Sequence, residues 1–144
     1  MIICFSIIFI FLLKGGWNGF KELVVTKKEK ESKNVTSFYF SHVDGSKMPD
    51  NFIPGQYLAI TIPKAAFGGK YDHDNTRNYS LSCAPGKGYL RCSIGRSVDG
   101  HVEEQSPYYG AVSNHMHDNV NQGDKILVRK YAVFYMIKQI KITI

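Results

Sequence analysis

Several common signatures are missing from this 144-residue sequence, and each absence narrows what the chain can be. It has only three cysteines, Cys4, Cys83 and Cys92, and no two are spaced as C-x-x-C. Neither a disulfide framework nor a zinc site is therefore indicated, and three unpaired thiols fit a reducing compartment. No G-x-G-x-x-G occurs, so the glycine pattern of a dinucleotide-binding βαβ unit is absent too.

The size and charge of the chain set broad limits. A chain of 144 residues has room for one domain, with a core sufficient for independent folding. The formal net charge is +6, from 18 Lys and Arg against 12 Asp and Glu. An excess of this size attracts phosphates, nucleic acid or acidic lipid without choosing among them.

The first thirteen residues are apolar apart from Ser6. As a helix they would span roughly 20 Å, which is short of the roughly 30 Å hydrocarbon core of a membrane. Three interpretations stay open: an imperfect signal or membrane anchor, a buried helix, or sequence joined to the domain by a gene rearrangement or a faulty gene model. Gly15-Gly16 then breaks the pattern. We therefore divide the chain into an apolar segment (1–14), a domain (15–130) and a tail (131–144).

Short β-branched and aromatic runs separated by turn residues fill the predicted domain. Such spacing predicts an all-β sandwich or barrel. The expected strands lie at residues 20–28, 35–40, 56–62, 77–82, 88–94 and 125–129. One helix is predicted over Ser113–Val120, with Ser113 as its N-cap and Gly123 just past its end.

Three groups of residues could bind a ligand. The first group offers a guanidinium, an aromatic ring and small polar groups, which suit a flavin nucleotide; it is Arg77-Asn78-Tyr79-Ser80. Gly110-Ala111-Val112-Ser113-Asn114 enters the helix, and a helix start binds anions. Tyr57 follows Pro54-Gly55-Gln56, so its ring could stack on a ligand. Taken singly, each is also explained by an ordinary strand, a capped helix or a core tyrosine.

The order and spacing of these groups resemble the FAD-binding domain of the flavohemoglobins (nitric oxide dioxygenases), within the ferredoxin–NADP reductase superfamily. The resemblance covers about residues 15 to 130. Its features are Gly15-Gly16-Trp17-Asn18-Gly19-Phe20, Pro54-Gly55-Gln56-Tyr57, Arg77-Asn78-Tyr79-Ser80, Gly110-Ala111-Val112-Ser113-Asn114, His117-Asp118 and Gly123-Asp124.

The resemblance implies a six-stranded antiparallel Greek-key barrel with one short helix, and FAD as cofactor. It implies that Tyr79 stacks near the flavin ring and that Ser80 bonds its edge, while Arg77 pairs with the diphosphate. Tyr57 would contact the adenine side of FAD, and Ser113 with neighbouring N–H groups would bind the pyrophosphate. The expected cofactor-binding set is Tyr57, Arg77, Asn78, Tyr79, Ser80, Gly110, Val112 and Ser113. No catalytic residue and no metal site are predicted.

In the resembled family, electrons pass from NAD(P)H through FAD to haem, which converts nitric oxide to nitrate. The family's globin and nicotinamide-binding domains have no counterpart in this sequence, so a separate haem or NAD(P)H-binding chain is an expected partner. Two alternatives stay open: a truncated, non-catalytic remnant and a basic barrel that binds nucleic acid. The predicted location is cytoplasmic, with membrane contact through residues 1–13 as the alternative.

Overall fold

A computed structural model of the chain describes residues 19–48, 52, 55–98 and 107–131. The predicted apolar segment 1–14 lies outside the described residues, as does the predicted tail apart from Tyr131. All six predicted strands are present, with ends shifted by up to two residues. The elements are β1 (Lys21–Lys30), β2 (Val35–His42), β3 (Tyr57–Ile62), the 3-10 helix η1 (Lys64–Phe67), β4 (Asn75–Ser80), β5 (Leu90–Gly95), α2 (Ala111–Asn119) and β6 (Lys125–Tyr131).

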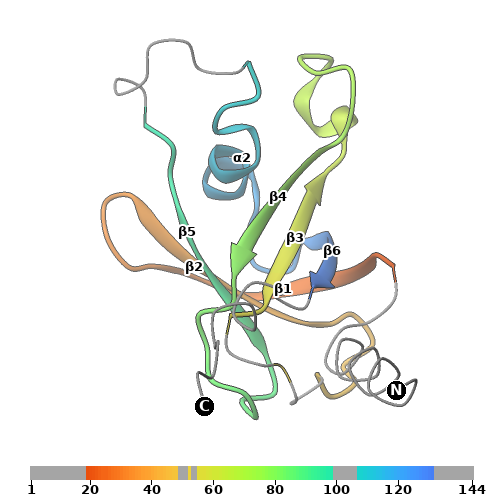
Figure 1. Ribbon diagram of the computed structural model, residues 1–144, viewed down its shortest axis with the longest axis vertical. Coiled ribbons are helices and arrows are strands. Elements are labelled where there is room, and N and C mark those ends of the chain that lie inside the picture. The colour runs from red at the N-terminus through yellow and green to blue at the C-terminus, as the bar shows by residue number, and fades with distance from the viewer. Residues whose placement is uncertain (1–18, 49–51, 53–54, 99–106, 132–144) are drawn as a thin grey trace, which may run out of the picture.

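The six strands form one antiparallel sheet in the order β4-β3-β6-β1-β2-β5. This order is the predicted Greek key, because β6 returns from the end of the described chain to lie between β3 and β1. The two edge strands, β4 and β5, meet at one bridge, Leu81 to Cys92. They diverge beyond that point, so the sheet curves like the predicted barrel but does not close (Figure 1).

Helix α2 lies in the gap between β4 and β5 (Figure 1). Val112 and Met116 lie on one face of this helix, four residues apart, and both are fully buried. Val120, the next residue of that stripe, is also buried just past the helix end. Burial of each such side chain contributes about 1.5–3 kcal/mol. The helix therefore closes the core where the sheet does not.

The helix starts two residues earlier than predicted, and Ser113 is not its N-cap. The N-cap is Gly110, whose backbone is left-handed with a φ of 69°. Ser113 is the third residue of the helix, and it is nearly buried. Among the described residues, no helix has both the length and the apolar character needed to cross a membrane.

Candidate functional site

Arg77 and Tyr79 place their side chains on the same face of β4, because side chains alternate along a strand. Arg77 lies opposite Ile60 and Tyr79 opposite Leu58, and both partners are core residues. This is the inner face of the sheet, on which α2 also packs. Tyr79 contacts the core and is partly buried, whereas Arg77 reaches solvent in the gap beside the helix.

The environment of Tyr79 keeps its hydroxyl neutral. Burial raises the pKa of Tyr79 to about 12. The backbone carbonyl of Tyr79 accepts a hydrogen bond from the Cys92 thiol, with 3.6 Å between sulfur and oxygen. This contact links β4 to β5 next to the Leu81–Cys92 bridge. The backbone of Tyr79 is thus held where the two edge strands approach each other.

The other two residues of the Arg-Asn-Tyr-Ser run, Asn78 and Ser80, point to the opposite face. Both are exposed. Tyr57 lies directly opposite Ser80 in the β3–β4 pair, so the two residues share that outer face. The expected residues of the two strands therefore fall into two groups: Arg77 and Tyr79 face α2, while Tyr57, Asn78 and Ser80 face away from it.

Gly110 allows the chain to turn sharply into α2. A Cβ at this position would lie 2.7 Å from Asn114 Nδ2 and 3.0 Å from Ser97 Cβ, closer than side chains tolerate. Its positive φ is also a conformation that residues with a Cβ rarely adopt. Val112 contributes a fully buried side chain to the core, so only its backbone N–H can face a ligand.

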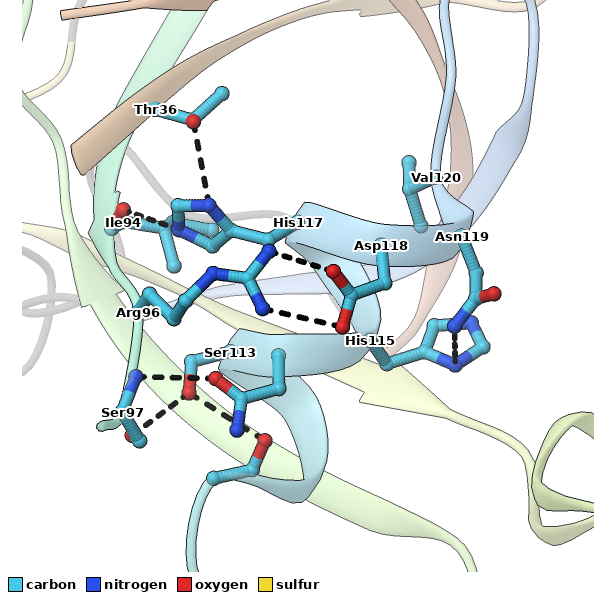
Figure 2. A network of polar contacts seen from close by, with 12 residues as sticks. Thr36, Ile94, Arg96, Ser97, Ser113, His115, His117, Asp118, Asn119 and Val120 are labelled. Carbon is cyan, nitrogen blue, oxygen red and sulfur yellow. Dashed lines mark hydrogen bonds and ion pairs between the residues drawn. The ribbon is translucent and has the colours of Figure 1, made fainter. Parts of the chain in front are cut away.

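A set of hydrogen bonds ties the start of α2 to the chain that leaves β5 (Figure 2). The hydroxyls of Ser113 and Ser97 lie 2.9 Å apart, and the Ser97 N–H donates to Asn114 Oδ1 at 3.1 Å. Ser113 Oγ also lies 3.5 Å from the carbonyl oxygen of Gly110. The hydroxyl predicted to bind pyrophosphate thus has protein partners at the helix start itself.

The end of α2 is fixed to β5 by charge and by a histidine (Figure 2). Arg96 donates two hydrogen bonds to the Asp118 carboxylate, at 2.5 and 3.2 Å, and this pairing lowers the pKa of Asp118. His117 Nε2 lies 2.8 Å from the carbonyl oxygen of Ile94, which requires the proton on that nitrogen. Nδ1 then accepts from the Thr36 hydroxyl at 3.3 Å.

Arg77 connects the two predicted motifs. Its Nη1 donates to the carbonyl oxygen of Thr76 at 2.7 Å, and its Nη2 lies 3.4 Å from the carbonyl oxygen of Tyr108, two residues before Gly110. The fold therefore brings the Arg77 guanidinium on β4 to the N-terminal, positive end of α2, although the two are more than thirty residues apart in the sequence. Both elements favour an anion.

Aromatic residues beside Arg77 were not predicted as part of the site. The ring centroid of Tyr108 lies 5.2 Å from that of Tyr71 and 4.7 Å from that of His73. The Tyr108 hydroxyl donates to Asp72 Oδ1 at 2.9 Å. Sequence reasoning missed this group because the rings come from two loops, whose proximity no local pattern reveals.

The histidines do not assemble into a metal centre within the described part of the chain. No group of three or more His, Cys, Asp or Glu side chains there could hold a metal ion. His117 uses both ring nitrogens in the contacts above, while His115 packs against Phe67 at a centroid distance of 5.2 Å. Partial burial lowers the pKa of His115.

A search with models of known protein families found no match. Comparison with curated proteins gave clear relatives. Flavohemoprotein A of Dictyostelium discoideum is 38% identical over 126 residues, which is 88% of this chain and 30% of that protein. The flavohemoprotein of Bacillus thuringiensis subsp. konkukian is 44% identical over 115 residues, 80% of this chain and 26% of that protein. The chain thus spans about 30% and 26% of the lengths of these two relatives.

Solved structures of flavohemoglobin domains also resemble this chain. The flavohem-like FAD/NAD-binding domain of nitric oxide dioxygenase from Vibrio cholerae matches with a TM-score of 0.62 and 30% identity, over 81% of this chain and 46% of that one. Flavohemoglobin from Malassezia yamatoensis, solved with FAD and haem, shares the fold with a TM-score of 0.53 at 17% identity, over 80% of this chain and 26% of that one. Together with the six-stranded sheet and its inserted helix, these likenesses place the chain in the flavohemoprotein family, as the β-domain of its reductase part.

Proposed function

We propose that this domain binds FAD across β4 and the start of α2. The observation that carries the proposal is the position of the Arg77 guanidinium, 3.4 Å from the backbone just before the helix. The residues there fit the cofactor's chemistry, since a guanidinium and helix-start N–H groups favour the negative charge of a diphosphate. The related Vibrio cholerae domain, described as FAD/NAD-binding, supports the assignment.

Each residue has a distinct task in this proposal. Arg77 holds the diphosphate, with the N–H groups of Val112 and Ser113 beside it. The Tyr79 ring packs on the flavin where β4 meets β5, and its raised pKa keeps the phenol uncharged. Ser80 is the last residue of β4, so in this proposal it donates a hydrogen bond to the flavin edge where the ring extends past the end of the strand. Tyr57 lies directly opposite Ser80. Its expected contact with the adenine side of FAD stays a prediction.

Bound flavin supplies the one- and two-electron redox chemistry that these side chains lack. In a full-length protein of this family, we propose that the domain accepts electrons originating from NAD(P)H and passes them towards haem, in the detoxification of nitric oxide to nitrate. The domain's own contribution is to bind the cofactor, orient its ring and shield one face from water.

A comparison of three ligands tests the site. The purified chain is titrated with FAD, FMN and riboflavin while quenching of flavin fluorescence is followed. We expect FAD to bind most tightly, because only FAD carries the diphosphate that Arg77 and the helix start would hold. Equal affinity for FAD and riboflavin would contradict the proposed diphosphate site, and no quenching with any of the three would contradict flavin binding altogether.

We further propose that the domain works in the cytoplasm. Cys83 and Cys92 are both free thiols, which suits a reducing compartment. Asn78-Tyr79-Ser80 is also an N-glycosylation acceptor, and Asn78 is exposed on the same face of β4 as Ser80. A glycan there would crowd the flavin end of the site. A mass shift on deglycosylation of protein from its native cell type, mapped to Asn78, would contradict this location.

A further inference from the structure

A β-bulge in β1 sorts the charges of the run Lys-Lys-Glu-Lys-Glu at residues 27–31. The register with β2 shifts between Val25 and Lys27. Val25 pairs with Phe40 and Lys28 pairs with Phe38, and these two phenylalanines share the inner face of β2. Lys28 therefore points to the inner face although it lies three residues from Val25, because the bulge inserts one extra residue.

The same shift sends Glu29, which lies between Lys28 and Lys30, to the outer face. Glu29 is neutralised there by Lys27, with 2.9 Å between nitrogen and oxygen, and it accepts a hydrogen bond from the Tyr39 hydroxyl at 2.8 Å. These contacts lower the pKa of Glu29. Lys28 and Lys30 are thus separated from the acid that alternates with them in the sequence.

The inner-face lysines line a pocket of about 390 Å³ at the end of α2. Its walls are Lys28, Lys30, Lys33, Thr36, Arg96 and His117, four cations with no carboxylate among them. Lys30 pairs with Thr36 across the sheet, and Thr36 pairs with Ile94, so the strands place these groups in one row. A volume of this size is typical of small-molecule sites, which run from roughly 300 to 1,000 Å³.

Two of the four cations are held in place by the fold. Lys28 Nζ donates to the carbonyl oxygens of His117 and Val120, both at 2.7 Å, and so caps the C-terminal end of α2. Arg96 is paired with Asp118 (Figure 2). Lys30 and Lys33 are exposed, and no hydrogen bond or ion pair engages their ammonium groups within the described residues. These two lysines supply the uncompensated charge.

We propose that this pocket binds a small oligophosphate anion, at a site separate from that of the FAD diphosphate. Lys30 and Lys33, beside Lys28, give the pocket an excess of positive charge even though Asp118 neutralises Arg96. Such an excess in a concave pocket matches an anion with multiple charged oxygens. The pocket is of small-molecule size rather than a broad flat surface, which favours a compact anion over an acidic protein face. It lies at the C-terminal end of α2, whereas Arg77 lies by the N-terminal end.

Pyrophosphate is the probe for this site. The full chain, labelled with ¹⁵N and saturated with FAD, is titrated while the amide signals of Lys30, Lys33 and Arg96 are followed. We expect saturable shifts confined to this pocket. The double variant Lys30→Gln/Lys33→Gln should weaken binding about tenfold. The control Lys87→Gln/Lys125→Gln removes the same charge at exposed positions outside the pocket and should leave the affinity nearly unchanged.

Three results would overturn the proposal. Shifts that do not saturate in the millimolar range would show no site, and equal weakening in both double variants would show attraction to net charge alone. Shifts at Lys30 and Lys33 that appear only without FAD, and vanish once FAD is bound, would merge the two sites into one. The variant Arg77→Ala separates the two ideas: it should lose FAD affinity and keep pyrophosphate affinity, so either site can fail without the other.

Discussion

The turn into α2 permits a quantitative test at Gly110. In Gly110→Ala, a left-handed φ of 69° costs the new side chain about 1–2 kcal/mol. Its Cβ would also lie 2.7 Å from Asn114 Nδ2, so Asn114 must move and lose its hydrogen bond from the Ser97 N–H. That bond is worth about 1 kcal/mol. We therefore expect the free energy of unfolding to fall by about 2–3 kcal/mol.

Gly45→Ala is the matched control. Gly45 has a φ of 73°, and a Cβ there would meet nothing within 4 Å, so this variant should lose only the backbone contribution. Both variants are measured by urea denaturation monitored through tyrosine fluorescence. In an Asn114→Ala background, which removes the clashing amide, the cost of Gly110→Ala should fall towards that of Gly45→Ala, with only the 3.0 Å contact to Ser97 Cβ left. If Gly110→Ala costs no more than Gly45→Ala in the natural background, the packing argument is refuted.

Three further predictions concern the proposed site. Arg77→Ala should weaken FAD binding by about 1.5–3 kcal/mol, the scale of a charged hydrogen bond, and leave riboflavin binding unchanged in the same fluorescence titration; an unchanged FAD constant would remove Arg77 from the site. Because burial raises the pKa of Tyr79 to about 12, above the ordinary value near 10, its ionisation opposes folding, so stability should fall as the pH rises from about 10 to about 12. Tyr79→Phe should remove that part of the fall and the late-titrating phenol from the ultraviolet titration, and a variant with the same titration curve as the natural protein would show that Tyr79 is not the shifted group. Finally, the printed sequence has no G-x-G-x-x-G, so this chain with FAD should not oxidise NADH faster than free FAD in a steady-state absorbance assay; faster turnover would reveal a nicotinamide site that the sequence pattern misses.

The strands could be predicted because their determinants are local. Short β-branched and aromatic runs, such as Val35–His42, end at turn residues that the sequence displays directly. The start of α2 was misplaced for the opposite reason. Ser113 has the chemistry of an N-cap, yet its hydroxyl pairs with Ser97, sixteen residues away, while Gly110 makes the turn through its backbone alone. A partner that distant leaves no local signal.

The site was predicted in part, for similar reasons. The Arg-Asn-Tyr-Ser run was identified as one group, but alternation on β4 divides it, with Arg77 and Tyr79 on one face and Asn78 and Ser80 on the other. The charges at residues 27–31 are mixed in sign along the sequence, with no local signal of which face each one occupies. The extra residue at the bulge after Val25 turns Lys28 and Lys30 to the inner face of the sheet and Glu29 to the outer face. A bulge of this kind depends on pairing with β2 rather than on composition.

The position of β6 governs when this domain can fold during its synthesis. Residues 125–131 form the last described strand, yet they lie in the middle of the sheet, between β3 and β1. A ribosome that has released everything up to α2 has produced two sheet portions, β3–β4 and β1–β2–β5. They approach each other at the Leu81–Cys92 bridge, but the edges of β3 and β1 that face β6 have no partner. Exposed strand edges promote association between chains. Cooperative folding must therefore wait until β6 has left the exit tunnel, and any nascent chain stalled before residue 125 is expected to need chaperones.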